Sequence, residues 1–113
     1  HMRSLYHRHV ETVGKAVDAG VPVYAGTDAG GTIAHGQIPT EIRLLSQLRD
    51  PLFGLGAASW RARSWLTGDQ EAAGLGVGAA ADLLVLDADP RRDVTAIAHP
   101  TFVVLRGRVL RDR

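Results

Sequence analysis

An α/β fold is predicted by three patterns in this sequence of 113 residues. Apolar residues recur at helical spacing over 5–19, and a nearly continuous apolar run follows at 21–25, as in a strand covered on both faces. From residue 82 onward the period changes to short strands separated by turn residues. Because this chain holds no parallel partner for the strand at 21–25, we expect its neighbours to come from other sequence or from a second copy.

The first helix and the strand after it have clear boundaries. Leu5, His9, Val13 and Val17 share one side of the helix, and Gly20 is a natural stop just past its end. Pro22 stands at the beginning of the strand, where its missing N–H is tolerated. A polar, glycine-rich turn over 26–32 then follows at the carboxyl end of the strand.

Two further helices are expected in the middle of the chain. Pro39 and Thr40 open a helix over 41–48, and Asp50-Pro51 combines an N-cap acceptor with a proline at the first helical position. We expect the helix from Pro51 to run to about residue 66, where Gly68 ends it. Its predicted packed stripe consists of Leu52, Leu55, Ser59, Ala62 and Leu66.

The last third of the chain predicts short strands and turns. Residues 82–87 are expected to form a strand, 94–97 a short irregular or helical piece, and 101–105 with 108–110 two strands joined tightly around Gly107. The glycines at 74, 76 and 78 imitate a nucleotide-binding loop, but no strand precedes them and no helix follows. We interpret them as a turn that leads into the strand at 82.

Composition excludes several classes of function. The 13 basic and 12 acidic residues give a formal charge of +1, so no global field recruits nucleic acid or an anionic membrane surface. Cysteine is absent, which excludes disulfides, thiol nucleophiles and thiolate metal sites. No run approaches the roughly 18 apolar residues of a membrane span, and no signal-peptide pattern is present. We expect a cytoplasmic protein, and we interpret residues 1–2, His-Met, as the remnant of an expression tag.

Asp28 is the strongest candidate for chemistry. Its carboxylate lies in a Gly-Thr-Asp-Ala-Gly-Gly turn just past a buried strand, the position at which α/β folds place ligands and catalytic groups. Glycines on both sides let the backbone approach a substrate or metal closely. The same pattern also fits a turn aspartate that hydrogen-bonds to its own backbone, so both interpretations stay open at this point.

Three segments, in order, resemble the amidohydrolase superfamily, with imidazolonepropionase-like and prolidase-like metal-dependent hydrolases as the nearest types. Residues 21–30 with His35-Gly36 resemble the eighth-strand segment of that family. Residues 74–90 are similar to its return from barrel to sandwich, and 103–109 to its closing hairpin. The resemblance covers almost the whole chain.

The resemblance implies a C-terminal fragment of a (β/α)8 barrel, with short antiparallel strands of a sandwich built from both chain ends. Residues 3–68 would hold the last barrel strand and its flanking helices, and 69–113 the sandwich strands. One or two divalent metals, usually zinc, would lie at the mouth of the barrel. Asp28 would contact the metal and shuttle a proton during hydrolysis of a C–N bond in a small amide substrate, because a metal lowers the pKa of bound water to about 7. His35 and Thr27 would contact the substrate, although His35 also fits a surface loop histidine.

The other ligands of that family cannot be matched here. His7 and His9 lie two apart on a predicted helix and point about 200° away from each other, so they cannot chelate one ion together. The chain thus carries one ligand of the roughly four that zinc requires, and we expect it to be inactive alone. Against a barrel of about 250 residues, its length predicts less than half a domain.

Two alternatives from other classes remain. The first is a non-catalytic structural module that associates with itself, because an orphan strand and apolar helix faces favour pairing with a second copy. The second is metal or ligand binding through His7, His9 and His35. Because the strand at 21–25 lacks partners here, we expect a homo-oligomer or a partner that supplies the missing barrel strands.

Overall fold

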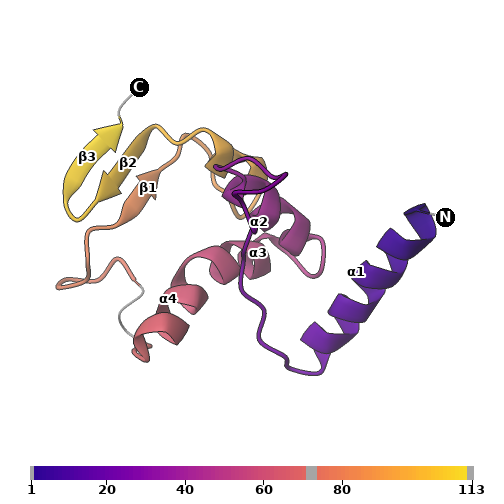
Figure 1. Ribbon diagram of the computed structural model, residues 1–113. Coiled ribbons are helices and arrows are strands. Elements are labelled where there is room, and N and C mark those ends of the chain that lie inside the picture. Colours follow the sequence, from indigo (N-terminus) through magenta and orange to yellow (C-terminus); the bar gives the residue numbers. More distant parts are fainter. Residues whose placement is uncertain (1, 71–73, 112–113) are drawn as a thin grey trace.

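Helices dominate the first two thirds of the computed structural model, and a small sheet forms the last third (Figure 1). The structure describes residues 2–70 and 74–111, so the first residue of the predicted tag remnant lies outside the described residues. The elements in chain order are α1 (Met2–Asp18), α2 (Ile38–Ser46), α3 (Pro51–Ala58), α4 (Trp60–Thr67), β1 (Leu83–Val85), the 3-10 helix η1 (Val94–Ala98), β2 (Phe102–Leu105) and β3 (Arg108–Arg111).

The predicted first helix is confirmed as α1, which lies to one side of the other elements (Figure 1). It ends before Gly20, which adopts a positive φ of 87°. Of its apolar stripe only Val17 is buried, whereas Leu5 and Val13 remain exposed. The apolar face that the sequence predicts therefore exists, but little of the described chain covers it.

The predicted strand at 21–25 is not formed: residues 21–28 belong to no helix or strand. Val21 is 52% exposed, so the segment is not buried as expected. A strand is stabilised by hydrogen bonds to a neighbouring strand, and no described strand lies alongside this one. Two backbone hydrogen bonds hold it instead, from the Val21 N–H to the Ala16 carbonyl at 3.0 Å and from the Ala25 N–H to the Ala57 carbonyl at 2.9 Å.

Helices α2 and α3 pack against each other. Helix α3 begins at Pro51 as predicted, whereas α2 spans Ile38–Ser46 and so begins and ends earlier than the predicted 41–48. Pro39 lies in the first turn of α2, and the Asp50 carboxylate accepts a hydrogen bond from the Phe53 N–H at 2.8 Å as the N-cap of α3. The contact is close because Gly54 has no side chain: a Cβ there would collide with Ser46 Oγ and the Ile42 carbonyl oxygen.

The single helix predicted from Pro51 to about residue 66 is wrong, because the chain breaks at Ser59 into α3 and α4. Ser59 has φ −135° and ψ −102°, well outside helical geometry. Two glycines in α3 weaken its helical preference, and Arg61 turns back so that its guanidinium lies 4.5 Å from the centre of the Phe53 ring. Gly68 ends α4 in the left-handed region, as expected.

The break also changes which residues pack. The predicted stripe is wrong: Leu66 is 74% exposed, and Leu52 and Ser59 are exposed as well. The buried residues of these two helices are small, namely Gly54, Gly56, Ala57 and Ser64. Close backbone packing rather than large apolar side chains thus forms this part of the core.

The predicted short strands are confirmed as an antiparallel sheet in the order β1-β2-β3. Leu84 pairs with Val103, and Val104 with Val109. The turn between β2 and β3 consists of Arg106 and Gly107, with φ values of 51° and 75°, which suits a tight hairpin of the primed type.

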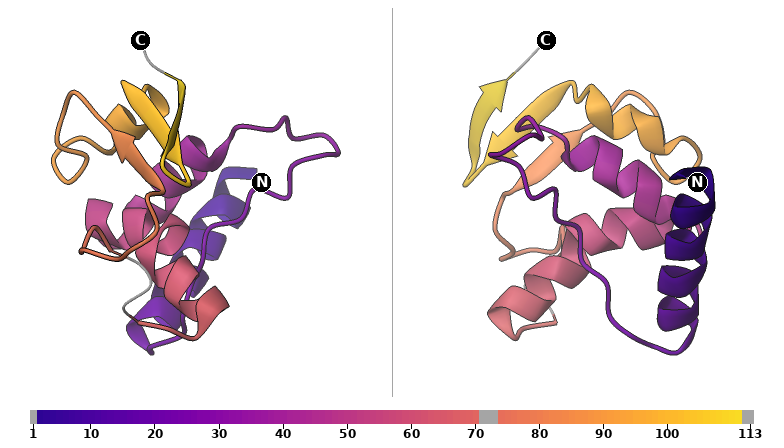
Figure 2. Two further views of the ribbon diagram at one scale, coloured as in Figure 1. Left: turned by 90° about the vertical axis from the view of Figure 1, so that its left-hand side faces the viewer. Right: turned by 45° about the vertical axis from the view of Figure 1, so that its right-hand side comes forward.

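The buried apolar core of the described residues is small and consists of Val17, Ile42, Ala57 and Ile97. Ile97 lies on η1, which contacts α2 and so connects the helical part to the sheet. Figure 2 shows this arrangement, with the sheet beyond α2 and α1 at the opposite side. No described helix combines the length and apolar character required to span a bilayer.

Candidate functional site

The glycine-rich loop between α1 and α2 carries the residues that the sequence predicts as functional. In the left view of Figure 2 this loop projects away from the helices. Asp28 is exposed and adopts φ 51°, in the left-handed region that aspartate tolerates better than most side chains. Gly30 has φ 126°, a conformation that favours glycine, and its N–H donates to the Ile33 carbonyl at 3.1 Å. The loop thus has a defined backbone that presents Asp28 to its surroundings.

Thr27 and His35 lie on the same loop but have different surroundings. The Thr27 hydroxyl oxygen accepts a hydrogen bond from the Ala29 N–H at 3.3 Å, so it helps to shape the turn beside Asp28. The His35 side chain is exposed. Among the described residues, neither the Asp28 nor the His35 side chain makes a hydrogen bond or an ion pair. The Asp28 carboxylate therefore makes no hydrogen bond to the described backbone of its own turn.

Two contacts hold the segment that leads to this loop. The Tyr24 ring stacks on the Trp65 ring of α4, with 4.9 Å between ring centres and 23° between ring planes. The Ala25 N–H donates to the Ala57 carbonyl at the end of α3. Asp28 follows three residues after Ala25, so α3 and α4 determine where its loop begins.

A complete metal site is not present in the part of the chain that the structure describes. No three His, Asp or Glu side chains gather there closely enough to hold one ion. His7 and His9 both lie on α1 and are exposed, although His9 belongs to the predicted apolar side of this helix. Asp28 alone does not fit the roughly four ligands of a zinc centre, so further ligands would have to come from outside these residues.

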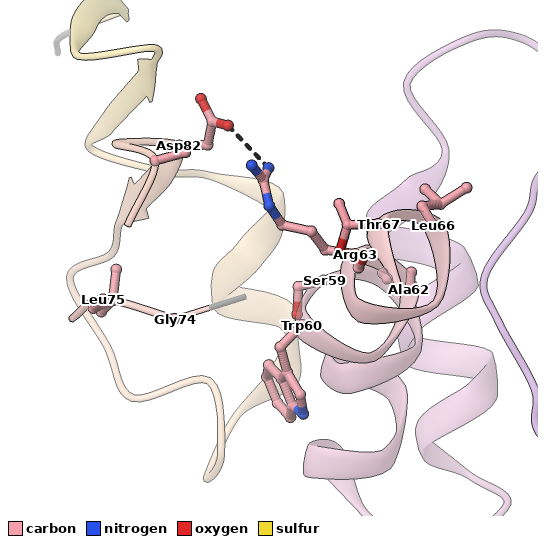
Figure 3. Close-up of a pocket in the computed structure, with 11 residues that line it drawn as sticks. Ser59, Trp60, Ala62, Arg63, Leu66, Thr67, Gly74, Leu75 and Asp82 are labelled. Atoms are coloured by element: carbon pink, nitrogen blue, oxygen red, sulfur yellow. Dashed lines mark hydrogen bonds and ion pairs between the residues drawn. The ribbon is translucent and has the colours of Figure 1, made fainter. Parts of the chain in front are cut away.

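A groove opens between α4 and the segment 74–82, with a volume of about 600 Å³ (Figure 3). Its apolar walls include Trp60 and Leu66 of the helix and Leu75 of the facing segment. The predicted turn at 74–78 is confirmed, since those residues form bends and turns before β1. This groove was not expected from the sequence.

An ion pair joins the two walls of the groove (Figure 3). Arg63 Nη1 lies 3.1 Å from Asp82 Oδ2, and the other oxygen of that carboxylate accepts from the Arg106 N–H at 2.7 Å. The Arg106 N–H and the Arg63 side chain hold the pKa of Asp82 below its usual value of 3.8, against a smaller opposing effect of desolvation. Asp82 thus links α4 to the tight turn between β2 and β3.

Sequence reasoning missed Arg63, Asp82 and the Tyr24–Trp65 stack. Asp82 stands next to an alanine run at the start of a predicted strand, and nothing nearby in sequence marks Arg63 as its partner. Trp65 remains 62% exposed and contacts Tyr24, a residue that the sequence analysis assigned to a strand.

This chain is similar to part of several longer proteins. No family model matches the sequence. Uncharacterized proteins of Mycobacterium tuberculosis and Mycobacterium bovis are 49% identical over 109 residues, which cover 96% of this chain and 28% of each relative.

Among solved structures, a prolidase complexed with N-methylphosphonate-L-proline matches with a TM-score of 0.80 and 27% identity. A second crystal structure, described as an uncharacterized protein, matches with a TM-score of 0.79 and 29% identity. Each match covers 92% of this chain and 26% of the other chain. The chain thus spans about a quarter of the length of the relatives and structures that it matches.

Proposed function

We propose that this chain is the C-terminal part of a metal-dependent amidohydrolase that hydrolyses C–N bonds of small substrates. The observation that carries the proposal is the similarity to a prolidase, in backbone (TM-score 0.80) and in sequence (27% identity), over 92% of the chain. Agreement along nearly the whole chain supports a common origin with a hydrolase. The chemistry itself has to be argued from the site, because one fold hosts many functions.

In this proposal the catalytic group of the chain is Asp28. Its side chain is exposed and makes no hydrogen bond within the described residues, and its loop has a defined backbone. We assign to its carboxylate a contact with a divalent metal, zinc by preference, and transfer of a proton at its oxygens. The other metal ligands would belong to the remainder of a (β/α)8 barrel, which this chain lacks.

We propose small amides, such as dipeptides and N-acyl amino acids, as the substrate class. The matching prolidase was crystallised with an N-substituted proline, and compounds of that kind are the first substrates to test. His35 and Thr27, on the same loop as Asp28, are the proposed substrate contacts of this chain.

The test compares the complete protein with its Asp28→Asn variant, for zinc content and for turnover of acyl-proline substrates. Asparagine is nearly isosteric and also tolerates a positive φ, so the substitution removes charge while keeping the loop. We expect turnover to fall about 10²- to 10⁴-fold, the usual contribution of general acid–base catalysis.

Asp18→Asn provides the matched control for this comparison. Asp18 makes an exposed ion pair with Arg49 at 3.7 Å, outside the loop, and its neutralisation should leave turnover unchanged. Undiminished turnover in the Asp28→Asn protein would remove the role assigned to that residue. Absence of hydrolysis in the unsubstituted protein across such substrates would overturn the function itself.

A second candidate function is a non-catalytic module that associates with itself. It is favoured by the exposed apolar face of α1, which includes Leu5, Tyr6 and Val13. Light scattering over a range of concentrations tests it, and a monomer of about 12 kDa at every concentration would rule it out.

A further inference from the structure

The groove between α4 and residues 74–82 offers apolar surface. Its serine, threonine and carboxylate groups are hydrogen-bonded, whereas Arg63 Nε is buried without a hydrogen-bond partner in the described chain. The Thr67 hydroxyl donates to the Arg63 carbonyl at 2.9 Å, and the Ser59 hydroxyl donates to the Leu55 carbonyl. Arg63 and Asp82 bind each other. A polar small molecule would need convergent free donors or acceptors to fix its orientation, and these side chains provide few of them.

Apolar side chains on both walls of this groove are largely exposed. Leu75 is 84% exposed and Leu66 is 74% exposed, on opposite walls. Trp60, which also lines the groove, is exposed as well. Contiguous apolar surface of this kind marks a site where another polypeptide segment packs.

The relatives indicate where that segment comes from. Nearly three quarters of each mycobacterial relative lies outside the region that matches this chain, which itself is matched over 96% of its length. In these relatives, the region that matches the groove-forming chain is therefore part of a much longer polypeptide.

We propose that an apolar segment of the same polypeptide, from outside these 113 residues, packs into this groove between Leu66 and Leu75. The inference rests on the part of the proposed function that makes this chain a piece of a longer protein, and not on its hydrolase chemistry. The Arg63–Asp82 pair then becomes a buried link at the base of that contact, covered by apolar side chains.

Thiol labelling of the complete protein tests the proposal, because this chain contains no cysteine. Single Leu66→Cys and Leu75→Cys variants are prepared, with any cysteine elsewhere in the protein replaced by serine. Labelling by a maleimide is then compared between native protein and protein unfolded in urea. We expect both groove cysteines to react at least tenfold more slowly in the native protein than in urea. Both leucines are exposed in this chain, so such protection requires an occupant.

Arg92→Cys, on the exposed turn after β1, is the control and should react at similar rates in both states. Native labelling at the urea rate at either groove position would overturn the proposal, as would an open reading frame that encodes only these residues. Protection that appears only as protein concentration rises would assign the groove to a second copy and also overturn it. Protection in a protein that lacks hydrolase activity would leave this inference standing while the proposed function fails.

Discussion

Helices α1 and α2 are both amphipathic in sequence, yet only α2 is packed within this chain. Ile42 of α2 is buried beneath α3 and η1, whereas Leu5 and Val13 of α1 are exposed. The difference lies in the neighbours. Helix α3 follows α2 after a short turn and approaches it closely through Gly54, while α1 is followed by a long segment without helix or strand. An apolar face thus predicts burial only where the chain itself supplies the covering element.

The largest expected effect on stability comes from truncating a buried side chain in the packed region around α2. Ile42→Ala removes most of a buried side chain and should lower the free energy of unfolding by about 2–5 kcal/mol, measured by urea denaturation. Leu5→Ala, the matched change on α1, should alter it by less than about 0.5 kcal/mol, because the residue is exposed. Equal losses at the two positions would show that α1 is packed as well as α2.

A smaller loss is expected from enlarging a residue at the helix contact. Gly54→Ala places a methyl group against Ser46 and the Ile42 backbone, and should destabilise the chain by about 1–3 kcal/mol. Gly14→Ala, in the middle of α1, meets nothing within 4 Å and should stabilise the helix by up to about 1 kcal/mol. Thermal or urea unfolding of both variants gives the signs, and a stabilising Gly54→Ala would disprove the close packing of α2 and α3.

The smallest effect is expected where charge rather than packing connects two regions. The pKa of Asp82 lies below 3.8 in the folded chain, so its contribution to stability is present above that pH and is lost as the pH falls through the lower, folded value. Asp89, whose pKa the Arg91 side chain and N–H lower to about 2, adds a loss of the same sign between about pH 4 and pH 2. Asp82→Asn should therefore flatten the acid side of a stability-against-pH curve, without abolishing its slope. An unchanged curve would show that the link from α4 to the hairpin turn contributes nothing.

Local patterns were enough to predict the elements that local interactions form. The Asp50-Pro51 start, the Gly20 and Gly68 stops, and the hairpin around Gly107 follow from dihedral preferences and caps, and the structure confirms each. The prediction of a strand at 21–25 is wrong because a strand needs hydrogen bonds to neighbouring strands. A local sequence pattern does not reveal whether such strands are present. The prediction of one continuous helix is wrong because helical periodicity does not reveal an interruption such as that at Ser59, after which Arg61 reaches back to the Phe53 ring.

The candidate site likewise contains residues that the sequence indicates and residues that only the folded chain brings together. Asp28, Thr27 and His35 could be named from their glycine-rich context, and the structure places all three on one loop. Whether they act together stays a prediction, since their proposed metal and substrate lie outside these residues. The Arg63–Asp82 pair joins residues far apart in sequence, and only the folded chain brings them together.

The break at Ser59 has a consequence for the loop that carries Asp28. In one continuous helix, the Ala57 carbonyl would accept the N–H of Arg61 in the regular ladder of hydrogen bonds. Ending α3 at Ala58 leaves its last carbonyls without helical donors, and the Ala25 N–H meets one of them. The same interruption that shortens the helix therefore provides an acceptor that anchors the incoming chain just before Asp28.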